Sequence, residues 1–477
     1  MSRSLGGAGL PALALALVLA CAVSTLPAAS TPATSPRPGA PGMGDPYFPQ
    51  DGNGGYDVLH YGVRNRYRFA RQHLSGRTRI TARATQNLSR FHLDFLLPVT
   101  QVRVNGRRAD FSRPNRHELR IRPQRQLARG SRFKVTVTYA GSPARVGWRG
   151  ERNWLANRDE VVTMNQPHMA AWWFPANDHP RDKAAMDVRI VVPKGRQVVS
   201  NGVLVQRRKR ARTTLWHWRA VEPMAPYLAF FAAGRFRIDS GTSAGLPWVA
   251  AVSKQLPRSR RASAMRSMRR SPELVRWLES QVGGYPFATT GGVTTSLRSG
   301  FALENQTRPT YPVVHGDMTW LLVHELAHQW FGNHVAVRNW RDIWLNEGLA
   351  TFFEARYVET HGGESAAQWL LRNHAERGPG SSFWLVPIGD PGKNRMFHEA
   401  VYVRGGMTIQ ALRQRIGEES FWTLIRTWVQ RHGGGNASTE DFRALAEEVS
   451  GEDLGAFFTA WLVTPAKPAA TSANGFG

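Results

Sequence analysis

Residues 324–328 read His-Glu-Leu-Ala-His, within a stretch from Asp317 to Phe331 whose apolar residues predict a helix. Residues four apart on a helix lie on one face, with about 5 to 6 Å between their Cβ atoms. The imidazoles of His324 and His328 can therefore reach one metal ion. The flanking side chains are mostly large and apolar, so the helix should be buried, where two histidines and a glutamate are costly without a bound partner. The stretch predicts a metal-binding helix rather than a chance pair of core histidines.

A third ligand is expected from the next helix along the chain. A catalytic zinc ion takes three protein ligands and keeps a fourth position for water. Residues 344–348 read Trp-Leu-Asn-Glu-Gly and open a second predicted helix, Asn346 to His361. A helix-loop-helix hairpin could fold Glu347 back over the two histidines. The sequence therefore predicts one Zn²⁺ ion per chain, held by His324, His328 and Glu347.

The spacing of the apolar residues divides the rest of the chain into two parts. Residues 133–139 alternate apolar and polar side chains, and Asn105-Gly106 is a strong hairpin signal. After about residue 241 the period becomes helical, as in residues 271–282, where a proline stands near the start and a glycine follows the end. We therefore predict an α+β fold, with a mostly antiparallel β domain over residues 45–240 and a mainly helical domain over residues 241–465.

The two ends of the sequence differ from these domains in composition. Residues 1–29 combine an early arginine, an apolar run and small residues, as in a secretory signal peptide. Residues 30–44 are rich in Pro, Ser, Thr, Ala and Gly and predict a flexible linker, and residues 466–477 predict a flexible tail. The sole cysteine, Cys21, stands in a loose lipoprotein-box context. We expect export, with Cys21 as a candidate lipid anchor and with no intramolecular disulfide.

Composition and charge limit the class of protein. Of the 477 residues, 42% are hydrophobic and 20% are charged, with 17 Trp and 22 Phe, which excludes a disordered chain and a polytopic membrane protein. The 62 Lys and Arg exceed the 35 Asp and Glu, and the net charge is +27. This charge favours association with anionic cell-wall or membrane surfaces. No nucleic-acid-binding signature accompanies it, so no nucleic-acid partner is expected.

The two predicted metal helices resemble those of the aminopeptidase N type of gluzincin zinc metallopeptidases, a family that includes leukotriene hydrolase. Residues 324–335 read HELAHQWFGNHV and residues 344–350 read WLNEGLA, with 18 residues between the second histidine and the glutamate, as in that family. Weaker similarity runs from about residue 56 to residue 461. The resemblance implies a β domain packed on a thermolysin-like catalytic domain, in a short secreted bacterial form without the C-terminal helical domain of larger members.

The resemblance also implies roles for side chains around the metal. Glu325 would take a proton from the zinc-bound water and hand it to the leaving amine. Tyr402, in a Tyr-Val-Arg-Gly stretch that matches the family's Tyr-x-Lys-Gly, would hydrogen-bond the oxyanion. Glu354 lies seven residues after Glu347, on the same helix face, and would orient a ligand imidazole. A core tyrosine and a solvated carboxylate are the structural alternatives for Tyr402 and Glu354.

Substrate binding in this family uses carboxylates that pair with a free α-ammonium group. Glu304 matches the glutamate of the family's Gly-x-Met-Glu-Asn motif, although Phe301 replaces the glycine. Gln166 stands where the family has a second carboxylate. An amide accepts a hydrogen bond from an ammonium group without supplying charge, so these departures weaken the predicted amine anchoring and leave the metal chemistry intact.

The sequence therefore predicts a secreted zinc metallopeptidase that acts on peptides, with aminopeptidase activity as the first hypothesis. A zinc endopeptidase is the alternative if Phe301 and Gln166 have dismantled the amine pocket. A non-catalytic cell-surface binding module with a structural metal is an alternative of another class. Epoxide hydrolysis, known in one branch of the family, has no supporting feature in this sequence.

Overall fold

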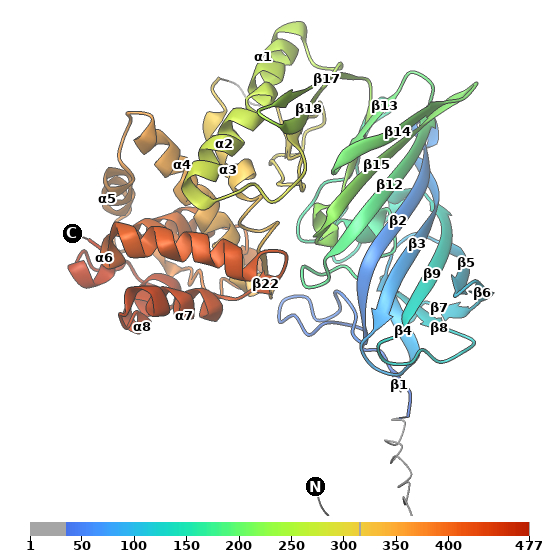
Figure 1. The fold of residues 1–477 in the computed structure, drawn as a ribbon, viewed down its shortest axis with the longest axis horizontal. Helices are drawn as coiled ribbons and strands as arrows, with labels where there is room; N and C mark the ends of the chain where they lie inside the picture. The colour runs from blue at the N-terminus through green and yellow to red at the C-terminus, as the bar shows by residue number, and fades with distance from the viewer. Residues whose placement is uncertain (1–34, 314–315, 477) are drawn as a thin grey trace, which may run out of the picture. The chain divides into compact units, whose positions relative to one another are not determined.

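The computed structural model describes residues 35–313 and 316–476. The predicted signal peptide, residues 1–29 with Cys21, lies outside the described residues, as does the first part of the predicted linker. Figure 1 shows strands predominating in the first half of the chain and helices in the second. The predicted α+β fold class is confirmed. Within the described part, every helix is too short or too polar to cross a membrane.

The largest sheet has eight strands in the order β14-β15-β12-β2-β3-β9-β5-β6. All neighbouring strands pair antiparallel except β2 and β12, which are parallel. The bounds of these strands are β2 (Tyr56–Arg68), β3 (His73–Ala84), β5 (Val99–Val104), β6 (Arg107–Arg108), β9 (Arg132–Gly141), β12 (Ala184–Pro193), β14 (Val203–Lys209) and β15 (Thr213–Met224).

Two four-stranded sheets complete the β domain. The first has the order β1-β4-β8-β7, and the second has the order β10-β11-β16-β13. Their strands are β1 (Arg37–Pro38), β4 (Leu88–Asp94), β7 (Asp110–Ser112), β8 (Glu118–Arg122), β10 (Leu155–Ala156), β11 (Val161–Val162), β13 (Gln197–Ser200) and β16 (Phe231–Gly234).

The sequence patterns of this domain have direct structural counterparts. In β9, Phe133, Val135 and Val137 are buried while the residues between them are exposed or half-buried, as alternation on a one-sided sheet requires. Asn105 and Gly106 join β5 to β6 with φ angles of 49° and 81°. Left-handed conformations at both central positions are what a two-residue hairpin turn needs, so the predicted hairpin is confirmed.

The helical domain begins with a small sheet and continues with helices. The sheet has the order β17-β18-β19-β20. Strand β17 runs from Phe236 to Ser243, so it crosses the domain boundary that was predicted between residues 240 and 241. The strands are β17 (Phe236–Ser243), β18 (Leu246–Ser253), β19 (Thr290–Thr294) and β20 (Thr310–Tyr311), with a separate pair β21 (Ala336–Val337) and β22 (Asn436–Ala437). The helices are α1 (Arg258–Arg269), α2 (Ser271–Val282), α3 (Thr319–Ala327), α4 (Trp344–Thr360), α5 (Ala366–Glu376), α6 (Glu399–His432), α7 (Thr439–Ser450) and α8 (Gly455–Phe458).

The three helices predicted from the sequence are present, and the bounds of two of them differ. The predicted helix from Asn346 to His361 is α4, which begins at Trp344 and ends at Thr360. The helix predicted to reach Phe331 ends as α3 at Ala327. The Gln329 and Trp330 amides bond to carbonyls three residues back, which tightens the chain into turns before Gly332, whose φ is 121°. The long α6 is bent at Gly417, where φ is 78° and ψ is 163°.

Two segments predicted to be flexible are packed in the structure. In the linker, β1 pairs with β4, and the Gly39 amide donates to the Arg90 carbonyl over 2.8 Å. In the tail, the Phe476 ring stacks on Trp461 at 5.9 Å, and the Trp461 indole donates to the Asn474 carbonyl over 3.1 Å. The linker is thus held through main-chain groups, and the tail through one buried aromatic ring and a main-chain carbonyl. A composition poor in apolar side chains therefore does not prevent their ordering.

Polar contacts join the two domains close to the metal helices. Lys183, in the loop before β12, donates to the Asn333 and His334 carbonyls over 2.8 Å each. The Arg181 guanidinium donates to the Arg338 carbonyl over 2.7 Å. Burial lowers the pKa of Lys183 to about 7. The segment that follows the first metal helix is therefore anchored on the β domain.

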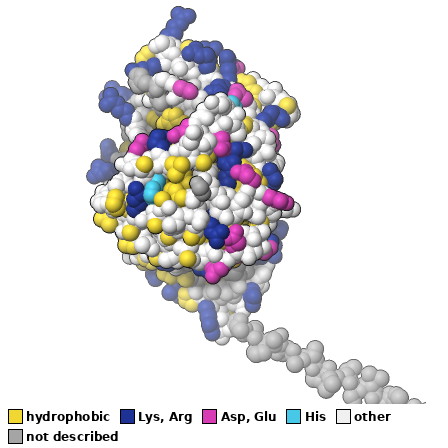
Figure 2. Space-filling model, turned by 90° about the vertical axis from the view of Figure 1, so that its left-hand side faces the viewer, with side chains coloured by type: hydrophobic (Ala, Val, Ile, Leu, Met, Phe, Trp, Pro, Cys, Tyr) yellow, Lys and Arg dark blue, Asp and Glu magenta, His cyan; other side chains and the backbone are white. Residues whose placement is uncertain are grey.

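Figure 2, which views the molecule from the left-hand side of Figure 1, shows basic and acidic side chains interspersed on that face.

Candidate active site

The three predicted metal ligands come together. His324 lies near the end of α3 and His328 one turn later, while Glu347 lies in the first turn of α4. Glu347 Oε2 is 3.3 Å from the Nε2 atom of each histidine, and one ligand atom from each residue fits within a 4.8 Å span. All three side chains are buried. We call this group the zinc trio.

The opposite ring nitrogen of each histidine is bound elsewhere, which turns Nε2 toward Glu347. His324 Nδ1 donates to Glu354 Oε1 over 2.6 Å, and His328 Nδ1 donates to the Phe331 carbonyl over 3.0 Å. Such partners fix the tautomer and the orientation of a metal-ligating imidazole. The donor set of two imidazole nitrogens and one carboxylate oxygen suits a catalytic Zn²⁺ ion. The residues present therefore fit the metal that the sequence predicts.

The charges of the zinc trio influence one another strongly. Burial alone would raise the pKa of Glu347, but the neighbouring His328 and His324 lower it to about 2. Glu347 is therefore an anion over the whole physiological range and is ready to bind a cation.

Glu325 lies beside the zinc trio without belonging to it. Its side chain is 5% exposed, and its Oε2 atom has no hydrogen-bond partner among the described residues. Burial raises the pKa of Glu325 to about 8. A free carboxylate oxygen next to a metal position is suited to exchanging a proton with water there.

A cavity of about 680 Å³ opens in front of these residues. Besides the zinc trio and Glu325, it is lined by the predicted site residues Gln166, Glu304, Glu354 and Tyr402. Its apolar wall includes Phe301, Trp320 and Phe397, which are 42%, 52% and 41% exposed. The structure thus brings every site residue predicted from the sequence to one cavity.

Tyr402 reaches this cavity because α4 and α6 cross at very short distance. A Cβ atom on Gly348 would lie 2.9 Å from the Gly405 Cα, and one on Gly405 would lie 2.8 Å from the Gly348 Cα. Only glycine tolerates such an approach at both positions. The crossing brings the Tyr402 ring to 6.0 Å from the His324 ring. Burial raises the pKa of Tyr402 well above its ordinary value, so the phenol keeps its proton.

Arg404, which stands where the family has lysine, binds main-chain carbonyl groups. Its guanidinium is buried and donates to four main-chain carbonyls, those of Trp384, Val386, Ala460 and Thr464, over 2.7 to 3.1 Å. A lysine has three donors on a single nitrogen and could not span these carbonyls in the same way. Arg404 therefore fixes α6, and with it Tyr402, against two other segments.

Glu304 and Gln166 meet at the β-domain side of the cavity. Gln166 Nε2 donates to Glu304 Oε1 over 3.2 Å, and the Tyr227 hydroxyl donates to the same oxygen over 2.9 Å. The Glu304 carbonyl accepts from Gln329 and Asn333, which follow the metal helix. Burial raises the pKa of Glu304. This carboxylate is therefore held in a fixed position beside the zinc trio.

Tyr227, Gln329 and Asn333 were not identified from the sequence as site residues. Gln329 and Asn333 lie inside the quoted stretch 324–335, but a hydrogen bond to a carbonyl leaves no signal in residue spacing. Tyr227 follows β15, and only the packing of the β domain on the helical domain brings it to Glu304.

The comparisons with known proteins all indicate the same family. The peptidase M1 N-terminal domain model matches residues 58–228, and the peptidase family M1 domain model matches residues 294–461. Aminopeptidase N of Lactococcus lactis subsp. lactis is 27% identical over 362 residues, which cover 68% of this chain and 41% of that protein. Leucyl aminopeptidase of Saccharolobus solfataricus is 25% identical over 331 residues, covering 65% and 41%. The chain thus spans about two fifths of the length of these relatives.

Solved structures of similar length match over their whole chain. An M1 zinc metallopeptidase from Deinococcus radiodurans, as a Glu→Ala variant bound to a Tyr-Ser-Ala substrate, superposes with a TM-score of 0.79 at 26% identity. The match covers 90% of this chain and all of the other. The unsubstituted enzyme gives a TM-score of 0.78. With both domain models matched and zinc metallopeptidases as structural neighbours, this chain belongs to peptidase family M1, the family of aminopeptidase N.

Proposed function

We propose that this protein is a zinc aminopeptidase that removes N-terminal residues from peptides. The observation that carries the proposal is the cavity in which the zinc trio, a free glutamate oxygen and a fixed buried carboxylate face the same space. His324, His328 and Glu347 would hold the metal. When bound, a Zn²⁺ ion supplies Lewis-acid polarisation of the scissile carbonyl and acidifies water.

Glu325 acts as the general base. Its unpartnered Oε2 takes a proton from the attacking water, and the protonated carboxyl then donates that proton to the leaving amine. Its raised pKa, about 8, suits both steps at neutral pH because proton transfer is most efficient when the pKa lies near the working pH.

Tyr402 donates a hydrogen bond to the substrate oxygen that gains charge. Its phenol stays protonated because burial raises its pKa, and its ring lies beside the His324 ring at the cavity wall. A donor aimed at the charge that develops in the transition state is worth more than one that binds substrate and transition state equally.

Glu304 and Gln166 anchor the substrate's free α-ammonium group. Two hydrogen bonds to Oε1 fix the Glu304 carboxyl, and an incoming cation would lower its raised pKa and keep it ionised. A fixed anion near the metal position limits how much peptide fits on the amine side of the scissile bond. This is the geometric basis of exopeptidase rather than endopeptidase action.

The test compares matched substrates with free and acetylated amines. An aminoacyl amide should be cleaved in a chelator-sensitive reaction, and its N-acetyl derivative should not be turned over. Equal rates on the two would overturn the exopeptidase part of the proposal. The zinc endopeptidase alternative rests on Phe301, which stands at the cavity wall where the family has glycine. Cleavage-site mapping by mass spectrometry on a long unblocked peptide decides it, because an endopeptidase cuts at internal bonds.

We also propose export through the signal-like segment 1–29, with Cys21 either removed with this segment or retained as a lipid anchor, and electrostatic association of the basic surface with anionic cell-surface polymers. Intact-mass analysis of the protein recovered from its host decides the first part, since cleavage before Cys21 with lipid addition and cleavage after it give different masses. Salt-sensitive binding to an anionic wall polymer tests the second.

A further inference from the structure

Three other metal-ligating side chains converge in the β domain. Asp94 ends β4, Glu118 begins β8, and the two lie directly opposite each other in the antiparallel register. His117 immediately precedes Glu118. One ligand atom from each of the three residues fits within a 4.8 Å span. We call this group the strand trio.

The facing atoms of the strand trio lack ordinary partners. Asp94, His117 and Glu118 are 0%, 1% and 2% exposed. Asp94 Oδ1, His117 Nδ1 and Glu118 Oε1 have no hydrogen-bond partner among residues 35–313 and 316–476. Buried polar atoms are nearly always paired, because leaving them unpaired is costly. Two carboxylates directly opposite each other in a buried strand pair add repulsion.

The spacing of these atoms suits a shared ion better than hydrogen bonds. His117 Nδ1 is 3.6 Å from Asp94 Oδ1 and 3.7 Å from Glu118 Oε1. A hydrogen bond joins atoms about 2.7 to 3.2 Å apart. Around a tetrahedral zinc ion with bonds of about 2.0 to 2.1 Å, neighbouring ligand atoms lie roughly 3.3 to 3.5 Å apart. Contraction within the 4.8 Å span that holds one ligand atom of each residue would let the three residues bind one cation.

The other atoms of the strand trio are held in place. Asp94 Oδ2 accepts from the Gly52 and Asp178 amides over 3.1 and 2.6 Å. Glu118 Oε2 is 3.1 Å from His92 Nδ1. The His117 ring is stacked on Trp148, with ring centroids 4.9 Å apart and planes 10° apart. In each carboxylate, one oxygen is thus fixed by a hydrogen bond and the other is left facing the shared space. Residues around a metal site orient its ligands in this way.

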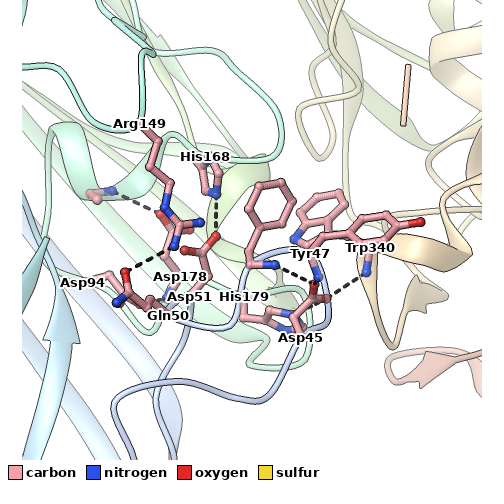
Figure 3. A network of polar contacts seen from close by, with 12 residues as sticks. Asp45, Tyr47, Gln50, Asp51, Asp94, Arg149, His168, Asp178, His179 and Trp340 are labelled. Atoms are coloured by element: carbon pink, nitrogen blue, oxygen red, sulfur yellow. Dashed lines mark hydrogen bonds and ion pairs between the residues drawn. The ribbon is translucent and has the colours of Figure 1, made fainter. Parts of the chain in front are cut away.

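The surroundings of the strand trio hold an excess of negative charge. Figure 3 shows Asp94 in a polar network with Asp178, Asp51 and His168. His168 is already paired with Asp51 and Glu151, and the Arg149 guanidinium, also drawn in Figure 3, donates to the Gln50 side chain. A bound divalent cation would relieve the repulsion between the carboxylates of Asp94 and Glu118.

A second cavity borders one residue of the strand trio. It has a volume of about 720 Å³ and is lined by Glu118, His92 and Asn115 among others. The Asn115 side chain accepts the His117 and Glu118 amides over 2.8 Å each, so the turn that carries these two ligands also borders the cavity.

We propose that Asp94, His117 and Glu118 bind a second divalent ion, Zn²⁺, whose role is structural. One imidazole nitrogen and two carboxylate oxygens form a donor set that Zn²⁺ accepts. The ion would connect β4 and β8 to the loops of Gly52 and Asp178. Since a chain with one cysteine cannot form an internal disulfide, a bound ion would supply a cross-link of another kind within this sheet.

The first test locates the metal in the unsubstituted protein. Crystals of the full chain grown with ZnCl₂ should give two anomalous peaks at the zinc absorption edge, one at the zinc trio and one within about 2.3 Å of Asp94 Oδ1, His117 Nδ1 and Glu118 Oε1. A peak at the zinc trio alone would overturn the proposal and leave the proposed peptidase function standing.

The second test counts metal in variants after exhaustive dialysis. Wild type should retain about two zinc equivalents, and His117→Gln and Glu347→Ala should each retain about one, because each removes a different ion. His60→Gln is the matched control, since His60 also pairs with a β-domain carboxylate, Asp187 at 3.0 Å, and should keep both ions. Added ZnCl₂ should raise the melting temperature of Glu347→Ala but not that of Glu347→Ala combined with His117→Gln. Equal zinc contents in wild type and His117→Gln would contradict the proposal.

Discussion

The zinc trio and the strand trio combine the same kinds of donor atoms in very different surroundings. The zinc trio faces a cavity of about 680 Å³ that also contains Glu325, whose Oε2 has no partner among the described residues. The strand trio is enclosed by main-chain amides and by Trp148. Donor chemistry alone therefore does not make a reaction site. A reaction needs space for the substrate and a group that can carry a proton beside the metal, and only the helical site has both.

The largest effect is expected from removing the proposed proton carrier, Glu325, from the helical site. We expect Glu325→Gln to lower kcat by about 10²- to 10⁴-fold, because an amide cannot take the proton of the attacking water. Zinc content should not change, since Glu325 is not a ligand. The measurement is kcat at saturating aminoacyl substrate together with metal analysis. His117→Gln, assayed in parallel at saturating zinc, should keep kcat within a few fold of wild type. Activity retained in Glu325→Gln would remove this residue from its proposed role.

Removing a single hydroxyl should give the next largest effect. We expect Tyr402→Phe to lower kcat by about 10²- to 10³-fold with little change in KM, because the lost hydrogen bond forms mainly in the transition state. Tyr357→Phe is the matched control. Its hydroxyl, also on a helix of this domain, accepts from Arg270 outside the cavity, so its loss should leave kcat unchanged. A parallel rise in KM with constant kcat for Tyr402→Phe would make Tyr402 a ground-state contact instead.

The difference between the two trios also explains what the sequence can reveal. His324 and His328 are four residues apart on one helix, so their meeting follows from helix geometry, and Glu347 needs only one hairpin. Asp94 and Glu118 are 24 residues apart and meet through strand register, which spacing alone does not give.

The same reasoning applies to the missed residues and segments. Tyr227 reaches Glu304 only through the packing of two domains. The linker residue Gly39 is held by a main-chain hydrogen bond, which depends on no particular side chain. Local periodicity therefore predicts the elements and the metal helices, while long-range pairing determines the amine side of the cavity and the strand trio.

The hydrogen bond that orients the His324 imidazole offers a further test of the zinc trio. Its expected effect is smaller and concerns zinc affinity alone. We expect Glu354→Gln to lower zinc affinity by about 10- to 100-fold, because the charged acceptor of His324 Nδ1 at 2.6 Å becomes a neutral amide. At saturating zinc, kcat should recover toward the wild-type value. Glu359→Gln, on the same helix but paired with Arg356 and Arg413, is the control and should leave zinc affinity unchanged. The readout is competition with a chelator of known affinity. Equal affinities for Glu354→Gln and wild type would mean that the hydrogen bond does not support the ligand.

The last prediction concerns a pH dependence of stability that originates beside the strand trio. Burial alone would lower the pKa of His168, but Asp51 and Glu151 raise it to about 10. Between the ordinary histidine value near 6.5 and about 10, the folded chain keeps a proton that the unfolded chain has lost. The free energy of unfolding therefore falls as pH rises through this window, by about 1.4 kcal/mol per pH unit for one proton.

Lys183 must be separated from this effect, because its lowered pKa, about 7, gives a slope of the opposite sign above that pH. The prediction therefore concerns the difference between wild type and His168→Gln. Denaturant unfolding at pH 7, 8 and 9 should show the advantage of wild type over the variant shrinking steadily with pH, while Lys183 contributes equally to both. A constant difference would mean that His168 is neutral in the folded chain.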